Sequence, residues 1–241
     1  MKINIMIQIN MFKKEIYMER RKVLAETVSS GIILLLGNEE SPMNYLDNTY
    51  HFRQDSTFLY YFGLDQPSLA GVIDADSGEV TVFGDDLSID MIVWMGSLPR
   101  LSVLGERVGV NNQKPLSALQ DTIKDAVSGG SKIHFLPPYR MDNRLKLRDF
   151  LDVDFEKAEE QSSLELLKAV IAQREIKSDE DIAEIDKAVE ISAEMHLAAM
   201  KIARPGLRES EVAAKVAEVA LSRNGQMAFP IIATINGQTL H

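Results

Sequence analysis

The side chains that could do chemistry are few and widely spaced in this chain of 241 residues. There are no cysteines, so the sequence excludes disulfides, thiolate metal sites and thiol proteases. The four histidines lie at positions 51, 134, 196 and 241. Because histidine changes its charge near neutral pH and binds metals, each is a candidate acid, base or ligand. The surroundings of each histidine then decide which role is expected.

Three of the histidines are expected to be structural or give no indication of a role. His196 falls in a helical stripe of apolar residues, which is typical of a hydrogen-bonded core or interface residue rather than a ligand. His51, next to Arg53, is also predicted to be structural, and His134 lies in a buried-looking strand that indicates nothing further. His241 follows a predicted hairpin, and its position alone indicates only an exposed histidine.

Three other patterns could carry function or position it. Trp94, the only tryptophan, lies at the end of an expected helix, where it could simply close a core. The run Asp74-Ala-Asp-Ser-Gly begins like a calcium loop but lacks the rest of the twelve-residue ligand pattern, so we predict a hairpin turn. Arg53 and Asp55 could form an ion pair, and we expect them to fix an aromatic helix against a sheet.

Composition excludes several classes of protein. With 36 acidic and 26 basic residues the net charge is −10, which disfavours a nucleic-acid surface. No run approaches eighteen apolar residues, so we predict no membrane span. The apolar N-terminus is interrupted at Asn4, Gln8 and Asn10 and lacks a cleavage site, so we predict no export. A cytoplasmic location is our expectation, and 45% hydrophobic content supports a proper core.

The first half of the chain is organised around the aromatic stretch of residues 50–65, a density of rings that marks a core anchor. Strands and helices alternate around it about every twelve residues, which predicts a sheet flanked by helices. We expect helices at residues 13–29, 86–94, 98–104 and 115–127, and strands at residues 31–37, 69–74, 80–83, 107–110 and 132–136.

The second half has a different pattern. Residues 156–163 are polar, and we place a domain boundary there, with domains at 1–160 and 161–241. Helices are expected at residues 164–171, 178–203 and 209–223, the second opening with the cap-like Ser178-Asp-Glu-Asp. A strand at residues 229–235, an Asn-Gly turn and the start of a second strand follow.

Several of these segments resemble the creatinase, prolidase and aminopeptidase P family. The aromatic stretch is similar to the family's Arg-x-x-Ser/Asp-x-Phe-x-Tyr-x-x-Gly run, with matches at Arg53, Ser56, Phe58, Tyr60 and Gly63. Trp94 and Gly96 resemble the Trp-x-Gly segment of the aminopeptidase P branch. The run from Arg174 to Ala188, the turn Arg204-Pro-Gly and the segment from Phe229 to His241 resemble the entry of its pita-bread metallopeptidase domain, with Asp181 where Glu is commoner.

The resemblance implies a fold and an activity. The fold would be α/β: a creatinase-type, ribonuclease H-like mixed sheet flanked by helices, then an incomplete α+β pita-bread domain. The activity would be that of a metal-dependent Xaa-Pro aminopeptidase, a hydrolase that removes the residue preceding proline. The family uses two divalent metals, usually Mn²⁺, held by two Asp, one His and two Glu. The resemblance also implies that this chain forms a homodimer or higher homo-oligomer, and that His241 and Trp94 contact the substrate.

The chain departs from the family's pattern in one important way. All five metal ligands should follow His241, so we expect an N-terminal portion that is not itself catalytic and binds no metal. A lesser departure is the run Ala233-Thr-Ile-Asn, which lacks the glycine usual before the turn. Two alternatives stay open: a metal-free scaffold of the same fold that binds protein partners, and a creatinase-type amidinohydrolase.

Overall fold

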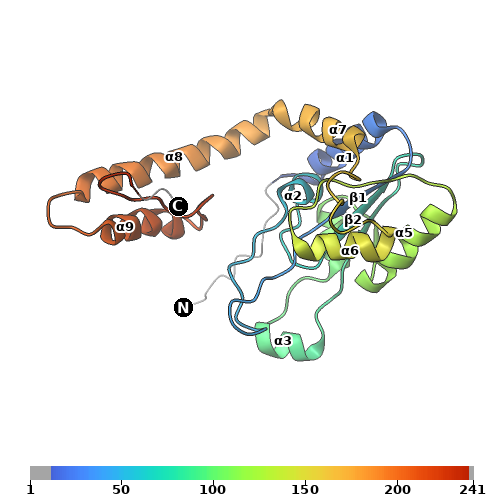
Figure 1. Cartoon of the computed structure of the whole chain (residues 1–241), viewed down its shortest axis with the longest axis horizontal. Helices are drawn as coiled ribbons and strands as arrows, with labels where there is room; N and C mark the ends of the chain where they lie inside the picture. The colour runs from blue at the N-terminus through green and yellow to red at the C-terminus, as the bar shows by residue number, and fades with distance from the viewer. Residues whose placement is uncertain (1–11, 239–241) are drawn as a thin grey trace. The chain divides into compact units, whose positions relative to one another are not determined.

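A computed structural model describes residues 12–238, and the chain forms two compact units (Figure 1). The first unit ends at Glu175 and the second begins at Ile176. The elements of the first unit are α1 (Lys14–Val28), β1 (Ile32–Leu36), α2 (Ser56–Phe62), β2 (Ala70–Asp74), β3 (Val80–Phe83), α3 (Ile89–Met95), α4 (Leu101–Arg107), β4 (Asn112–Lys114), the 3₁₀ helix η1 (Leu116–Ala118), α5 (Leu119–Ser128), β5 (Ile133–His134), α6 (Met141–Leu151) and α7 (Leu164–Glu175).

A five-stranded mixed sheet, ordered β4-β3-β2-β1-β5, forms the centre of the first unit. β1 pairs antiparallel with β2 and parallel with β5, and β3 pairs antiparallel with β2 and parallel with β4. Successive side chains of a strand point to opposite faces. Ile33 and Leu35 accordingly pack in a core with α1, α2, α4 and α7, whereas Leu34 packs in a second core with α5 and α6. The predicted helix-flanked sheet is confirmed.

The predicted hairpin is the best-defined part of this sheet. β2 and β3 pair from Ala70↔Phe83 to Ile73↔Val80. The Asp74 carboxylate accepts hydrogen bonds from the backbone N–H groups of Asp76 (2.9 Å) and Ser77 (3.1 Å), so its oxygen shapes the turn, as expected. In β2, a Cβ added at Gly71 would lie 2.2 Å from the ring of Phe62, so this strand position leaves the space that the ring occupies.

The aromatic stretch forms α2, whose two ends are fixed by specific residues. The Asp55 carboxylate accepts hydrogen bonds from the N–H groups of Thr57 (2.9 Å) and Phe58 (2.8 Å) and so caps the first turn. Gly63 ends the helix in the left-handed conformation, with φ of 64°. Phe58, Tyr61 and Phe62 are fully buried, which confirms the core anchor predicted from the sequence.

A buried arginine joins α1 to the end of α2. Arg21 is 2% exposed, and its guanidinium donates hydrogen bonds to the backbone carbonyls of Tyr61 (2.7 Å), Val108 (2.6 Å) and Gly109 (3.2 Å). Burial removes water from the cation and lowers the pKa of Arg21 to about 10, so the side chain stays charged at neutral pH. Three carbonyls from two separate chain turns therefore converge on one side chain.

The strand predicted at residues 107–110 is wrong. α4 continues to Arg107, and the N–H groups of Val108 and Val110 both bond to the carbonyl of Gly105, which closes the helix in a turn. Gly109 at this turn has φ of 68°. Val108 and Val110 are buried because the turn packs into the core, and two valines separated by one residue gave a false strand pattern. The strand lies later, at β4.

The second unit contains two described helices, α8 (Asp179–Ile202) and α9 (Glu209–Ser222), which pack on one another. The predicted capping box is confirmed: the Ser178 hydroxyl accepts from the N–H of Asp181, and the Asp181 carboxylate accepts from the N–H of Ser178, each at 3.2 Å. Arg223 also forms an ion pair with Glu194 at 2.6 Å.

The strand predicted at residues 229–235 is wrong for the part of the chain that the structure describes. Residues 225–238 contain no strand, although residues 235–237 bend where the Asn-Gly turn was expected. A strand is defined by pairing, and the second arm of that hairpin would begin outside the described residues. The predicted domain boundary after residue 160 stays a prediction; the compact units divide after Glu175 because α7 packs on α1.

We expect Arg21→Met to lower the free energy of unfolding of the first unit by about 2–4 kcal/mol, because it leaves buried carbonyls without donors. Chemical denaturation followed by circular dichroism measures this loss. Lys22→Met is the matched control, since Lys22 neighbours Arg21 on α1 and its side chain is 63% exposed. A change within about 0.5 kcal/mol is expected there. Equal losses in both variants would refute the proposed role of Arg21.

Candidate functional site

Trp94 lies on α3, a helix whose apolar side chains face solvent in the described chain. Ser88 caps its start by accepting a hydrogen bond from the N–H of Met91 at 3.2 Å, and Gly96 follows its end. Trp94 is 77% exposed, so the interpretation of a core tryptophan is wrong. Its apolar neighbours on the same helix are also exposed, namely Ile89, Met91, Ile92, Val93 and Met95. We call these six residues the α3 surface.

The α3 surface lies on a segment that leaves the sheet after β3, and hydrogen bonds fix this segment at its base. The Asp86 carboxylate accepts a hydrogen bond from the N–H of Leu101 (2.7 Å), at the start of α4. The Asp85 carboxylate accepts one from the N–H of Leu116 (3.2 Å), at the start of η1. Two adjacent aspartates thus anchor the segment that leaves β3, whereas none of the residues of α3 is buried.

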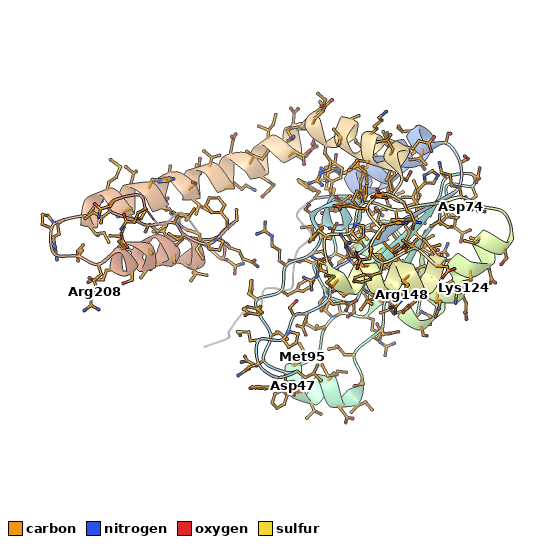
Figure 2. All side chains as sticks on the ribbon, in the orientation of Figure 1. Asp47, Asp74, Met95, Lys124, Arg148 and Arg208 are labelled. Carbon is orange, nitrogen blue, oxygen red and sulfur yellow. The ribbon has the colours of Figure 1, made fainter. Side chains whose placement is uncertain are left out.

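A second exposed apolar group lies on the loop that follows β1. Met43, Tyr45, Leu46 and Tyr50 are 49–81% exposed on this loop. An antiparallel bridge between Pro42 and Thr49 narrows it. In Figure 2, Asp47 of this loop and Met95 of α3 lie at the same end of the first unit. Exposed aromatic and aliphatic side chains in such number are typical of an interaction surface.

The base of this loop is clamped by buried amides. The N–H of Asn38 donates to the side-chain oxygen of Gln54 (2.8 Å), and the Asn38 side chain donates to the carbonyl of Arg53 (2.8 Å). Gln54 in turn donates to the carbonyl of Gln66 at 2.7 Å. Asn38 and Gln54 are 3% and 5% exposed. The loop of residues 39–53 therefore leaves the end of β1 and returns to the start of α2 between two positions, Asn38 and Gln54, that are hydrogen-bonded to each other.

Charged residues gather just beyond the end of β1. Glu39 forms an ion pair with Lys146 of α6 and accepts a hydrogen bond from the Ser68 hydroxyl. Arg140 donates to the backbone carbonyl of Glu39 at 3.0 Å and pairs with Asp142 at 3.1 Å. The charges are matched, so this cluster is a structural fastening of the loop to α6 rather than a site with unbalanced charge.

The histidines are not brought together by the fold. His51 is exposed. His196 is exposed on α8, so the core alternative is wrong for the described chain, and the interface alternative stays a prediction. His134 is buried and hydrogen-bonded, and His241 lies outside the described residues. The histidines thus give no common centre within residues 12–238.

The described residues do not fit the two divalent metals implied by the resemblance. Between residues 12 and 238 no group of three or more histidine or carboxylate side chains is placed to hold a metal ion. A dinuclear centre needs several such ligands around a shared site. This part of the chain therefore offers no place for the pair of ions.

Two family models match the chain, one on each unit. The model for the aminopeptidase P N-terminal domain matches residues 17–134, and the model for metallopeptidase family M24 matches residues 183–241. The two matches together span most of the chain, in the order in which the motifs were found. The chain thus carries a match to the aminopeptidase P N-terminal domain, followed by a match to part of metallopeptidase family M24.

Curated relatives of the chain carry the names of Xaa-Pro peptidases. A human Xaa-Pro dipeptidase is 25% identical over 207 residues, covering 86% of this chain and 41% of its own length. A probable Xaa-Pro aminopeptidase of Blastomyces gilchristii is 26% identical over 229 residues, covering 92% of this chain and 43% of its own. The chain spans less than half the length of the curated relatives it matches.

Solved structures of two aminopeptidases share the fold. Aminopeptidase PepP of Pseudomonas aeruginosa superposes with a TM-score of 0.74 at 24% identity, over 88% of this chain and 49% of that chain. A zinc-substituted Escherichia coli aminopeptidase P in complex with product gives 0.73 at 21% identity, over 89% and 50%. These likenesses confirm the fold class that the resemblance implied.

Sequence reasoning singled out Trp94 but missed the rest of the α3 surface. The signal was present: Met91-Ile-Val-Trp-Met95 is a continuous apolar run with no helical period, although the helix that it forms is not buried. The clamp of Asn38 and Gln54 had no such signal, because single amides carry no pattern.

Among the described helices, none has both the length and the apolar composition that a membrane span requires.

Trp94 offers a direct spectroscopic check, because it is the only tryptophan. We expect fluorescence emission close to that of free tryptophan in water, and strong quenching by acrylamide, in dilute protein. Trp94→Phe should abolish the signal and leave the unfolding transition unchanged, since the side chain has few internal contacts. Blue-shifted emission that resists quenching at the lowest protein concentration would contradict the exposed position.

Proposed function

We propose that this chain is the N-terminal portion of a Xaa-Pro aminopeptidase. The observation that carries the proposal is the pair of family matches, in order, one on each compact unit. Relatives named as Xaa-Pro aminopeptidase or dipeptidase match along 86–92% of the chain. The substrates would be peptides with proline at the second position.

A dedicated enzyme for such peptides has a physical rationale. The bond before proline is a tertiary amide without an N–H, and proline fixes φ, so a protease that binds an extended backbone holds it poorly. We propose that two Mn²⁺ ions in the intact protein activate water for attack on this bond. Their ligands, two Asp, one His and two Glu, would be supplied by sequence following His241.

His241 and Trp94 are the proposed substrate-binding residues of this chain. His241 would donate a hydrogen bond to the oxygen of the attacked carbonyl, where negative charge develops in the transition state. Trp94 would line the substrate mouth from the first unit. The support is the motif match at both positions and, for Trp94, an indole that is 77% exposed on a helix with fixed ends.

We also propose that the intact protein is a homo-oligomer in the cytoplasm. The α3 surface and the exposed side chains of the loop after β1 would meet a second copy, because so much contiguous apolar surface on one segment is costly in water. The absence of cysteines suits a reducing compartment.

The metal-free scaffold of the same fold remains the second candidate. The large exposed apolar surface favours it, since binding of partners needs no metal ligands. The residues of the intact protein decide between the two: two Asp, one His and two Glu at metal spacing support the peptidase, and their loss supports the scaffold. A creatinase-type amidinohydrolase is distinguished by turnover of creatine in place of peptides.

Activity measurements test the peptidase directly. We expect the intact protein with Mn²⁺ to cleave a fluorogenic Xaa-Pro peptide and not the matched Xaa-Ala peptide, whereas the 241-residue chain cleaves neither. In the intact protein, His241→Ala should lower kcat by about 10²–10³ if the side chain donates to the oxyanion. His51→Ala is the control for a histidine outside the site. Turnover by the 241-residue chain would overturn the proposed placement of the metal centre.

Self-association of the 241-residue chain tests the exposed apolar surfaces. The second unit exposes Ile182, Ile185, Val189 and Met200 on α8, and the first unit exposes the α3 surface. We expect light scattering to show that the unsubstituted chain forms dimers or larger species. These species should be lost in the double variant Val93→Ser/Trp94→Ser, in the double variant Ile185→Ser/Val189→Ser, or only when all four substitutions are combined. Loss in the first pair assigns the contact to α3, and loss in the second assigns it to α8. A clean monomer for the unsubstituted chain would contradict the prediction.

A further inference from the structure

His134 is a buried titratable group that the proposed activity does not use. The side chain is 1% exposed and lies in β5, which pairs with β1 in the first unit. Its Nδ1 atom is 2.7 Å from the hydroxyl oxygen of Ser163, and its Nε2 atom is 3.1 Å from the backbone carbonyl of Ser30. The imidazole therefore connects β5 to two other segments, at Ser30 before β1 and at Ser163 before α7.

The hydrogen bonds determine which nitrogen carries the proton. The carbonyl of Ser30 can only accept, so Nε2 must donate to it and bear the hydrogen. In the neutral imidazole Nδ1 is then an acceptor, and the Ser163 hydroxyl donates to it. This direction of the bond needs the neutral form, because a protonated Nδ1 can only donate; the Ser163 oxygen must then accept from Nδ1, and the hydroxyl hydrogen must rotate to another acceptor.

Ser163 is also the residue that starts α7. Its hydroxyl oxygen accepts the N–H of Leu166 at 3.2 Å, and its own N–H donates to the carbonyl of Phe135 at 2.9 Å. The same hydroxyl thus caps the first turn of α7 and holds His134. The last turn of α7 is fixed separately, where Arg174 donates to the Thr57 hydroxyl at 3.0 Å.

The charges around His134 come from two side chains. Lys132 pairs with Glu165 of α7 at 2.7 Å, and the same Glu165 oxygen is 3.9 Å from Nδ1 of His134. Burial, followed by the charge of Lys132, lowers the pKa of His134, while Glu165 and the carbonyl of Ser30 oppose the shift. Ser30 and Gly31 on the facing loop add no charge.

We propose that His134 is an acid-sensitive latch that holds the start of α7 against the sheet. In acid a proton from solvent binds Nδ1, which then donates to the Ser163 oxygen. The hydroxyl hydrogen loses its acceptor and must rotate, and the N–H of Leu166 now shares the oxygen with a second donor, so the cap weakens. α7 then opens at its first turn while Arg174 still holds its last turn. The protein thereby gains a local conformational change at its N-terminal unit on acidification.

The sign follows from linkage. Because the folded-state pKa lies below the unfolded value of 6.5, the unfolded chain takes up a proton first as the pH falls. The latch is fully effective above this value and is lost as the pH falls from 6.5 through the folded-state pKa. A shift in the opposite direction would have strengthened the latch in acid.

Hydrogen exchange of the whole 241-residue chain tests the proposal. After division by the intrinsic exchange rate at each pH, the amides of Leu166 and Leu167 should lose protection below about pH 6.5. His134→Gln can still accept from Ser163 and donate to Ser30 but does not titrate, so its protection should not change with pH. Ser163→Ala should lose protection at every pH, and His51→Gln, an exposed control, should behave as the unsubstituted chain does.

Nitrogen chemical shifts of the His134 ring give a second readout that needs no variant. The latch requires a neutral ring protonated at Nε2 near pH 7.5 and a titration midpoint below 6.5. A ring protonated at Nδ1, a midpoint at or above 6.5, or protection at Leu166 that falls equally in His134→Gln and the unsubstituted chain would each overturn the proposal.

Discussion

The first unit depends on the buried guanidinium of Arg21. Arg21 brings together the end of α2 and the turn after α4. The backbone carbonyls of these two segments have no donor within a helix or strand, and they accept hydrogen bonds from Arg21 instead. Helix ends leave carbonyls without intrahelical donors, and burying these without a partner is costly. A single guanidinium presents several donors in one plane, so it can serve carbonyls from both segments. No carboxylate is needed nearby, because the carbonyl dipoles and the ring of Phe62, 5.3 Å from the guanidinium carbon, face the cation.

This junction explains why the aromatic stretch can be so dense. Phe58 and Phe62 stack at 5.0 Å, and Tyr60 and Tyr61 meet edge to face at the same separation. Such rings supply a large apolar area but few hydrogen bonds. The polar connections are made by α1 and α7 instead: Arg20 lies 3.9 Å from the centre of the Tyr60 ring, and the Tyr61 hydroxyl donates to Gln173 at 3.0 Å. Aromatic burial and peripheral polar contacts are thus divided between different elements.

Much of this fold could be predicted from the sequence, and the failures have a common cause. β1, the hairpin of β2 and β3, α2 and the Ser178 cap were correctly predicted because each is specified by neighbouring residues. The strands at residues 107–110 and 229–235 were wrong because pairing depends on a distant partner that local pattern does not reveal. In the candidate site the family motif marks Trp94, which the structure shows exposed, and His241, which lies outside the described residues; their contact with substrate stays a prediction. Arg21 and His134 were missed, since isolated polar residues acquire their role only from the tertiary contacts that surround them.

The contact between Gly71 and Phe62 has an evolutionary consequence. The Phe62 ring lies against the backbone of β2 at Gly71, where an added Cβ would overlap it. Position 71 therefore cannot gain a side chain by itself: a larger residue there is tolerated only after the side chain at 62 has become smaller. Sequences that descend from this one should therefore change at positions 62 and 71 together, and such paired changes would mark the packing of α2 on the sheet.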